Sequence, residues 1–188
     1  SSGMKPIERP ALPWLTACTW NIFKTSGRSS LLLTGSKQTG KTTLLETLLE
    51  NRPVPGVRSV VERGEDGKPR HIFLADRLGD ARYLVGQRDT GPMEPMPAGF
   101  ASGTAFLQAA AESPCPWAAV DEIGFLEECS PAYQAALEEL FDRKRVIAAL
   151  RKADTPLLCR LRRRPDCLVL DLDLWPAWAP GPENGTGP

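Results

Sequence analysis

The chain has little of what metal centres, disulfide scaffolds and membrane proteins are built from. Among its 188 residues are one histidine and five cysteines. No two cysteines have the spacing of a metal-ligand pair, and an odd, dispersed set of thiols is typical of a reducing compartment. No apolar run approaches the roughly 20 residues of a membrane-spanning helix, and the start of the chain shows no signal-peptide pattern. We therefore expect a cytoplasmic protein whose cysteines fill small spaces in the core.

An excess of charge of one sign is also missing. The 23 basic and 23 acidic residues cancel at pH 7. Binding to DNA, RNA or a membrane surface through electrostatics requires a net positive charge or a basic patch. The balance therefore predicts neither a nucleic acid nor a membrane as partner, and it leaves any protein partner undefined.

The chain is long enough for one domain with a full hydrophobic core, and its ends differ from its middle. Residues 1–3 have the composition of a cloning scar, and residues 5–28 hold several aromatic and aliphatic side chains after a Pro-rich start. We interpret the latter as an amphipathic segment that packs on the domain. The expected parts are the scar plus N-terminal extension (1–28), the main domain (29–174) and a tail of Trp, Gly and Pro (175–188).

Apolar runs of strand length alternate with segments of helical period along the main domain. The predicted strands cover 30–34, 82–86, 117–120, 146–150 and 167–173, with a β-hairpin over 57–76. The predicted helices cover 41–50 and 103–113, and two more begin at Pro131 and Pro156 after Ser130 and Thr155 as caps. The Gly- and Pro-rich segment 87–103 is interpreted as a long loop. This alternation predicts an α/β fold with a mainly parallel sheet and an antiparallel addition at one edge.

In the stretch "LLLTGSKQTGKTTLLETLLE" (31–50), a predicted buried strand and a leucine-striped helix are separated by eight residues of types that do not fill a hydrophobic core. It satisfies the phosphate-loop pattern of Gly, four residues, and Gly-Lys-Ser/Thr. Glycines let successive backbone N–H groups face one concavity, to which the helix start adds its unpaired N–H groups and positive dipole end. Lys41 supplies a charge for the β- and γ-phosphates, and the Thr42 hydroxyl can ligate Mg²⁺. The predicted nucleotide-binding residues are Gly35, Ser36, Lys37, Gln38, Thr39, Gly40, Lys41 and Thr42.

Two further groups follow predicted strands, where ligands bind in parallel sheets. Asp121 ends a small-residue strand and is placed to hold Mg²⁺, directly or through water. Glu122 comes next and is the candidate to polarise a water for attack on the γ-phosphate. Arg151 and Lys152 follow the next strand, and either is a candidate for a cation that acts like an arginine finger.

The phosphate-loop stretch, the segment "VDEIGFLE" (120–127) and the order of elements from about 30 to 173 resemble the nucleoside-triphosphatase family typified by the thermophilic and the human cancer-related enzymes. The second segment matches that family's Asp-Glu-Ile-Gly-x-Met-Glu signature. The resemblance implies a three-layer phosphate-loop fold and slow, broad-specificity hydrolysis of nucleoside triphosphates. By position it places Gly40, Lys41, Thr42 and Thr43 in the phosphate loop and Asp121, Glu122, Gly124 and Glu127 in the acidic signature.

The chain departs from this family at three places. Gln38 stands where the family usually has Gly, and Leu126 replaces its Met. The family's second strand is only faintly echoed here, so the resemblance assigns no firm role to Arg58, Glu62 and Arg63.

Two other functions stay open on the sequence alone. A nucleotide or small-molecule kinase would use an Arg-rich lid, for which the segment 151–166 supplies four arginines after Arg151. A guanine-specific GTPase switch would use Asp-x-x-Gly at 121–124 and a guanine reader at 151–154, where Arg151 replaces the usual Asn. The short spacing between these two motifs argues against the switch. No residue pattern identifies the base of the nucleotide.

Overall fold

Strands and helices alternate along most of the chain in the computed structural model, which describes residues 11–174. The strands are β1 (Ser30–Thr34), β2 (Gly56–Arg63), β3 (Pro69–Asp76), β4 (Arg82–Gln87), β5 (Glu94–Pro95), β6 (Trp117–Ile123), β7 (Arg145–Leu150) and β8 (Cys167–Asp171). The helices are α1 (Leu12–Ser26), α2 (Lys41–Leu49), α3 (Pro97–Glu112), α4 (Pro131–Arg143) and α5 (Pro156–Arg162), with 3-10 turns η1 (Leu126–Cys129) and η2 (Leu172–Leu174).

All eight strands form one sheet in the order β5-β4-β3-β2-β6-β7-β1-β8. The neighbours in the stretch β2-β6-β7-β1-β8 of this order all pair parallel. The pairs β2-β3, β3-β4 and β4-β5 are antiparallel. The predicted fold class is therefore confirmed, and the antiparallel part is larger than one hairpin because β4 and β5 continue it. β7 lies between β1 and β6, so the residues that follow β7 emerge between those that follow the other two strands.

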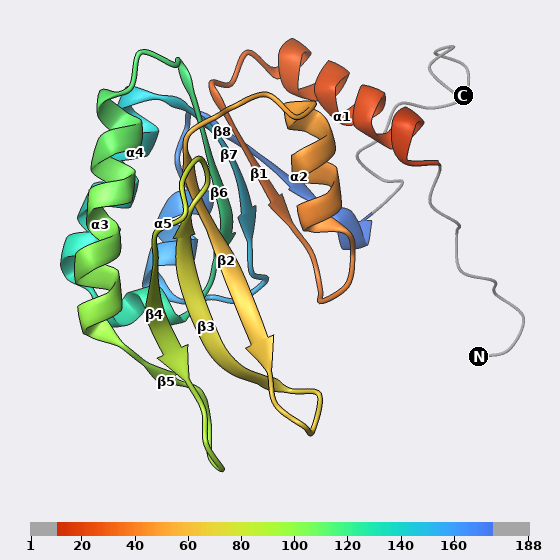
Figure 1. Cartoon of the computed structure of the whole chain (residues 1–188). Helices are drawn as coiled ribbons and strands as arrows, with labels where there is room; N and C mark the ends of the chain where they lie inside the picture. Colours follow the sequence, from red (N-terminus) through yellow and green to blue (C-terminus); the bar gives the residue numbers. More distant parts are fainter. Residues whose placement is uncertain (1–10, 175–188) are drawn as a thin grey trace, which may run out of the picture.

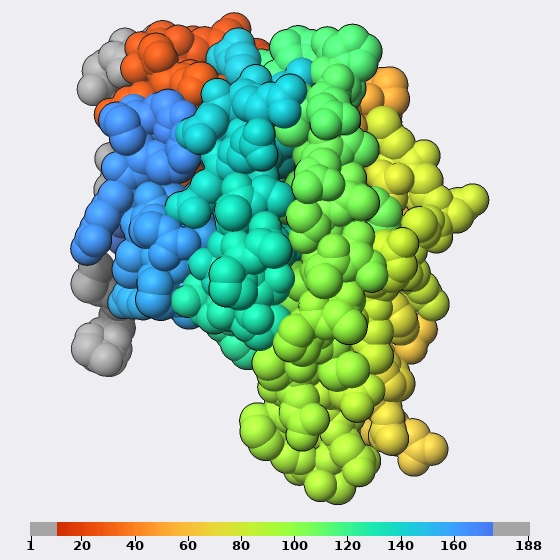
Figure 2. Space-filling model, turned by 90° about the vertical axis from the view of Figure 1, so that its left-hand side faces the viewer, coloured from red at the N-terminus to blue at the C-terminus, as the bar shows by residue number. Residues whose placement is uncertain are grey.

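Helices cover the two faces of the sheet and give three layers (Figure 1). α1 and α2 pack on one face, and α3, α4 and α5 pack on the other. Figure 2 looks onto the second face, where α3, α4 and α5 follow one another across the surface in chain order. The site that the sequence predicts lies at neither face but at the edge where the parallel strands end.

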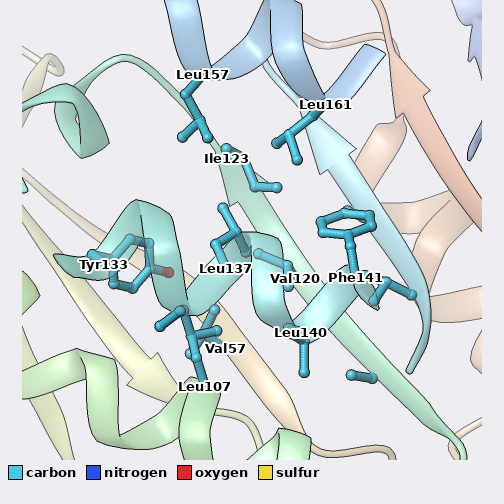
Figure 3. Packing of buried hydrophobic residues seen from close by; sticks show 14 of the residues in the cluster. Val57, Leu107, Val120, Ile123, Tyr133, Leu137, Leu140, Phe141, Leu157 and Leu161 are labelled. Carbon is cyan, nitrogen blue, oxygen red and sulfur yellow. The ribbon is translucent and has the colours of Figure 1, made fainter. Parts of the chain in front are cut away.

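The core has two parts because the central strands are buried on both sides. In β1 the side chain of Leu32 belongs to the cluster under α3, α4 and α5, while Leu31 and Leu33 belong to the cluster under α1 and α2. This alternation explains why the strand is a continuous apolar run in the sequence. Figure 3 shows the first cluster, in which Leu137 and Leu140 of α4 lie against the sheet.

Local signals placed several helix boundaries correctly. The Ser130 hydroxyl accepts a hydrogen bond from the Tyr133 amide (3.3 Å) at the start of α4, and the Thr155 hydroxyl accepts one from the Leu158 amide (3.3 Å) at the start of α5. α2 ends at Leu49, where Glu50 turns to a left-handed conformation (φ 52°). These contacts confirm the predicted starts and the predicted end.

The predicted long loop over 87–103 is wrong in its second half. β5 forms over 94–95, and α3 begins at Pro97 instead of at 103. Gly99 and Gly103, which suggested a loop, lie in α3 where it crosses the sheet closely: a Cβ on Gly99 would lie 1.7 Å from the carbonyl oxygen of Leu84. The glycines are therefore needed for packing and not for a turn. Only residues 88–93 connect β4 to β5 without regular structure.

The ends of the chain were predicted only in part. The amphipathic N-terminal segment is α1, whose Leu15 and Phe23 are buried against the domain.

Two predicted strands differ in where they end. β6 continues through Asp121 to Ile123, and β8 ends at Asp171 with η2 in place of its predicted last two residues. The expected scar (1–3) and the Trp-containing tail (175–188) lie outside the described residues. None of the helices within residues 11–174 is long and apolar enough to cross a membrane.

Candidate functional site

The predicted phosphate loop connects β1 to α2 at the lower edge of the sheet in Figure 1. Three of its residues have positive φ: Gly35 (150°), Gln38 (62°) and Gly40 (86°). A Cβ on Gly35 would lie 2.9 Å from the Thr39 hydroxyl, so the loop closes on itself there. Gln38 adopts a left-handed conformation although it has a side chain, which costs about 1–2 kcal/mol. The curled backbone is thus kept at the position where the resembling family usually has Gly.

Lys41, the first residue of α2, reaches across the loop with a side chain that is only 10% exposed. Its Nζ donates to the carbonyl oxygens of Gly35 (3.0 Å) and Leu150 (3.3 Å). The same nitrogen forms an ion pair with the carboxylate of Glu122 (2.9 Å). All three ammonium protons therefore have acceptors, and a phosphate that enters the loop has to replace some of these contacts.

Thr42 and Asp121 meet as the sequence predicts for a magnesium site. The Thr42 hydroxyl donates to Oδ1 of Asp121 (3.2 Å). Burial raises the pKa of the Asp121 carboxyl, while the bond from Thr42 lowers it and the nearby charge of Glu122 raises it further. A hydroxyl beside a carboxylate fits a hard cation such as Mg²⁺, which usually takes one or two protein ligands and completes its shell with phosphate oxygens and water. Residues 11–174 contain no group of three or more His, Cys, Asp and Glu that could hold a metal alone.

The two basic residues after β7 point to different neighbours. The guanidinium of Arg151 stacks on the ring of Phe125, 4.7 Å from its centroid. Phe125 lies three residues after Glu122 in the acidic segment. Lys152 forms ion pairs with Asp171 (2.8 Å) and Asp173 (3.0 Å) at the end of β8. Arg151 therefore lies on the side of the acidic segment, and Lys152 lies on the opposite side of the phosphate loop.

Asp173 is a site residue that the sequence did not reveal. Its carboxylate accepts hydrogen bonds from the amide (2.9 Å) and the hydroxyl (2.8 Å) of Ser36, and Lys152 and Ser36 together lower its pKa. It thereby ties η2 to the first turn of the phosphate loop. The only sequence signal was an acidic residue at the end of a strand, which by itself specifies no partner.

Glu127 is the most buried acidic side chain near the site. It is 6% exposed, and its Oε2 accepts a hydrogen bond from the Gly124 amide (2.8 Å). Burial raises its pKa from 4.5 to about 7, against the lowering effect of that bond. The resemblance places Glu127 in the acidic signature, and the structure shows that its carboxylate turns inward and contacts the backbone between itself and Glu122.

Glu62 and Arg63, to which the resemblance assigns no firm role, make their contacts away from the site. Glu62 pairs with His71 (3.4 Å) and Arg82 (3.5 Å), and Arg63 donates to the Gly67 carbonyl (2.9 Å), all within the antiparallel part. Arg58 differs, because it lies opposite Asp121 in the pairing of β2 with β6.

Three of the four arginines that suggested a kinase lid are engaged elsewhere. Arg160 binds Glu138 (2.9 Å) on α4, and Arg162 binds Asp154 (2.6 Å). Arg164 bridges Asp142 and Asp166. These ion pairs hold α5 and the following turn to the domain, and the pairing of Asp154 also occupies the position of the guanine reader.

Comparison with known proteins gives one family. A family model described as NTPase matches residues 30–175. The nucleoside-triphosphatase THEP1 of Thermotoga maritima is 25% identical over 159 residues, which cover 76% of this chain and 86% of that protein. THEP1 of Thermotoga sp. strain RQ2 is 24% identical over the same length and coverage. The crystal structure of THEP1 from the hyperthermophile Aquifex aeolicus superposes with a TM-score of 0.60 at 18% identity, over 76% of this chain and 89% of that one, and shows the shared fold.

Proposed function

The chain belongs to the NTPase family, and we propose that it hydrolyses nucleoside 5'-triphosphates to the diphosphate and phosphate in the presence of Mg²⁺. The observation that carries this proposal is the meeting of Lys41, Thr42, Asp121 and Glu122 at the phosphate loop. A loop that only binds phosphate has no need of an acidic residue beside its lysine. The relatives named nucleoside-triphosphatase support the same activity.

The substrate phosphates would lie in the curled loop over 35–40 and at the start of α2. There the backbone N–H groups and the helix dipole favour negative charge. Lys41 would turn from Glu122 to the β- and γ-phosphates. Thr42 and Asp121 would hold Mg²⁺, which supplies charge neutralisation to the phosphate oxygens when bound.

Glu122 would then act as the general base. While Lys41 is paired with it, the carboxylate is neutralised, and the movement of Lys41 to the phosphates releases it. The oxygen of a water forms a bond to the γ-phosphorus as the bond from that phosphorus to the bridging oxygen breaks, and the proton of the water passes to Glu122. The nucleoside diphosphate leaves with the electron pair of the broken bond. Arg151 would stabilise the charge that develops during this step.

We also propose slow turnover with little base selectivity. Each cycle has to break the Lys41–Glu122 ion pair, which supports a low rate. The relatives' names specify nucleoside triphosphates without one base, which supports broad selectivity. The five free cysteines fit a cytoplasmic location, and the packing of α1 against α2 supports treating the N-terminal extension as part of the domain.

The test is phosphate release from ATP, GTP, CTP and UTP, with and without Mg²⁺, for the wild type and two variants. Glu122→Gln keeps the shape of the side chain but cannot take up a proton, so turnover should fall by about 10²- to 10⁴-fold. Its affinity for the diphosphate should equal or exceed that of the wild type, because Lys41 loses the ion pair that competes with phosphate.

Asp121→Asn should give a different defect. It weakens the metal site, so the Mg²⁺ concentration needed for half-maximal turnover should rise. Wild-type turnover in Glu122→Gln would show that another group activates the water, and equal Mg²⁺ dependence in Asp121→Asn would remove Asp121 from the metal site.

A further inference from the structure

Neither core packing nor an ion pair explains why the carboxylate of Glu127 is buried. Its side chain enters the domain just after β6, and none of the ion pairs within residues 11–174 includes it. A buried charge without a counter-charge is unfavourable unless hydrogen bonds or function maintain it. Its carboxylate accepts a hydrogen bond from the amide of its own residue, and the one side-chain bond that reaches another residue in this part of the chain is with the Gly124 amide, at 2.8 Å. That bond is therefore the place to look for its role.

No cation among residues 11–174 forms an ion pair with Glu127; Arg151 lies on the far side of Gly124 and stacks on Phe125 instead. Glu122 and Glu128 act on its carboxylate as like charges and raise its pKa. Burial raises the pKa values of Cys129 and Tyr133, and the negative charge of Glu127 raises them further.

The other elements packed against η1 are β5 and α5. Glu94 of β5 is exposed. The two arginines of α5, Arg160 and Arg162, are paired with Glu138 and Asp154. None of these elements therefore supplies a positive charge that would hold the Glu127 carboxylate in place.

Gly124 lies between Glu127 and Arg151. A Cβ on Gly124 would be 3.8 Å from Oε1 of Glu127 and 3.9 Å from Cδ of Arg151. The residue before Gly124 is also fixed, because the Ile123 carbonyl accepts a hydrogen bond from the Arg151 amide (2.9 Å). The turn that follows Glu122 is thus held by a carboxylate on one side and by the chain after β7 on the other.

We propose that Glu127 is a positioning residue for the hydrolytic step: its carboxylate, by holding the Gly124 amide, fixes the turn that aims Glu122 at the phosphate loop and brings Phe125 under Arg151. This inference rests on the proposed function. A charged acceptor binds an amide more strongly than a neutral one, so the turn is held best when Glu127 is ionised. Because Glu127 touches neither the loop nor the metal site, it should affect turnover and not nucleotide binding.

The first experiment compares Glu127→Gln with Glu128→Gln. The control removes the neighbouring charge, which accepts a hydrogen bond from the Leu157 amide (3.2 Å) at the start of α5, away from the phosphate loop. Misplacing a reacting group by about 1 Å costs up to about 10²-fold, so Glu127→Gln should lower kcat by about tenfold or more at about pH 8. The Kd for the diphosphate with Mg²⁺ should stay within about threefold, and Glu128→Gln should stay within about twofold in both quantities.

The pH dependence separates positioning from a merely structural role. Protonated Glu127 resembles Gln, so the ratio of wild-type to Glu127→Gln turnover should narrow to about twofold at about pH 6. A ratio that is constant between the two pH values, or equal turnover at about pH 8, overturns the proposal.

The stability of Glu127→Gln should not fall together with its turnover. The folded-state pKa of Glu127 lies above its unfolded value, so its contribution to stability is present at low pH and is lost as pH rises through about 7. Glu127→Gln should therefore melt at the same or a higher temperature than the wild type at about pH 8, while it is less active. A large fall in melting temperature there would show that the residue is structural.

A measurement on the wild type needs no variant. In an NMR titration the amide of Gly124 should shift with a midpoint near the pKa of Glu127, about 7. If the amide does not titrate, the contact does not exist in solution and the proposal is wrong. If the wild type releases no phosphate from any nucleoside triphosphate, the proposed function fails, and the titration still decides whether Glu127 holds Gly124.

Discussion

The parallel and antiparallel parts of the sheet use their charged residues differently. In the parallel part, which has helices on both faces, the polar residues follow the ends of β1, β6, β7 and β8 and contact one another around the phosphate loop. In the antiparallel part several charged residues pair with residues of the neighbouring strand or turn. Arg82 stacks on Phe73 (4.1 Å) and pairs with Glu62, while Arg88, the residue after β4, binds Asp66 (2.8 Å) in the β2–β3 turn.

The difference follows from strand direction. Parallel strands bring all their carboxyl ends to one edge, so residues far apart in the sequence meet there. Antiparallel neighbours bring a start beside an end, so a charged residue usually meets the strand next to it. Figure 1 shows the β2–β3 and β4–β5 turns extending past the same edge as the phosphate loop, yet the ion pairs of these turns join them to each other. We infer that chemistry resides in the parallel part and that the antiparallel part mainly supports it.

β2 joins the two parts. It pairs parallel with β6 so closely that a Cβ on Gly56 would lie 1.8 Å from the Ala119 carbonyl oxygen. The Ser59 hydroxyl of the same strand lies 3.5 Å from the Glu122 amide. The antiparallel part therefore adjoins the candidate site through β2, and Arg77, which follows β3, also binds Glu46 of α2 (2.7 Å). Substitutions farther from these two connections should separate catalysis from stability.

The largest effect is expected for Lys41→Ala in the parallel part. Its matched control is Lys68→Ala, the same substitution in the β2–β3 turn. Loss of Lys41 removes the cation that would bind the β- and γ-phosphates, so turnover should fall on the order of 10³-fold and affinity should weaken. The melting temperature should change little, because Glu122, 34% exposed, can be solvated when its partner is lost.

The measurements for this pair are nucleotide affinity, phosphate release and thermal melting. Lys68→Ala should match the wild type in all three. Unchanged affinity in a folded Lys41→Ala protein would remove the phosphate-loop assignment, and an equal loss in the control would remove the contrast between the two parts.

Arg151→Ala and Lys152→Ala test whether the two neighbouring cations after β7 have different roles. Arg151 lies on the side of the acidic segment, so its loss should lower kcat by about 10²-fold with little change in Kd. Lys152 holds Asp173, which in turn binds Ser36, so its loss should weaken nucleotide binding more than it lowers kcat. Steady-state kinetics with diphosphate binding separate the two outcomes. If both variants stay within about threefold of wild type in kcat, neither cation acts in the transition state.

Much of the fold could be predicted because its signals are local. Strands such as 30–34 are apolar along their whole length, and Ser130 and Thr155 mark helix starts by a side chain that bonds three residues ahead. The phosphate loop is a contiguous pattern, so Lys41 and Thr42 could be placed from the sequence. Asp121 and Glu122 could be placed because they come at the end of a predicted strand.

The contacts that complete the site could not be predicted, because they join distant residues. Nothing in the sequence near Asp173 indicates that it binds Ser36, which is 137 positions away. The pairing of Lys41 with Glu122 depends on β6 and β1 lying on either side of β7, a strand order that periodicity does not give. The inward turn of Glu127 depends on the burial of η1.

The segment 97–103 shows the same limit, because it begins the helix α3, which packs closely on β4. Its Gly99 allows a test in which helix propensity and packing predict opposite changes in stability. Helix propensity alone makes Gly99→Ala stabilising by about 1 kcal/mol, because Ala is the better helix former. The structure predicts the opposite, since the new Cβ would lie 1.7 Å from the Leu84 carbonyl oxygen of β4 and α3 would have to move away.

We expect Gly99→Ala to lower the free energy of unfolding by about 2 kcal/mol or more, while turnover per folded molecule stays at the wild-type value. The control is Gly91→Ala, in the connection between β4 and β5, where a Cβ would meet no atom within 4 Å and stability should stay within about 0.5 kcal/mol. Denaturant unfolding gives the stability of both variants, and phosphate release below the unfolding transition gives their turnover. A stabilised Gly99→Ala protein would mean that α3 does not cross β4 this closely. A stable variant with reduced turnover would mean that the antiparallel part contributes to catalysis and not only to support.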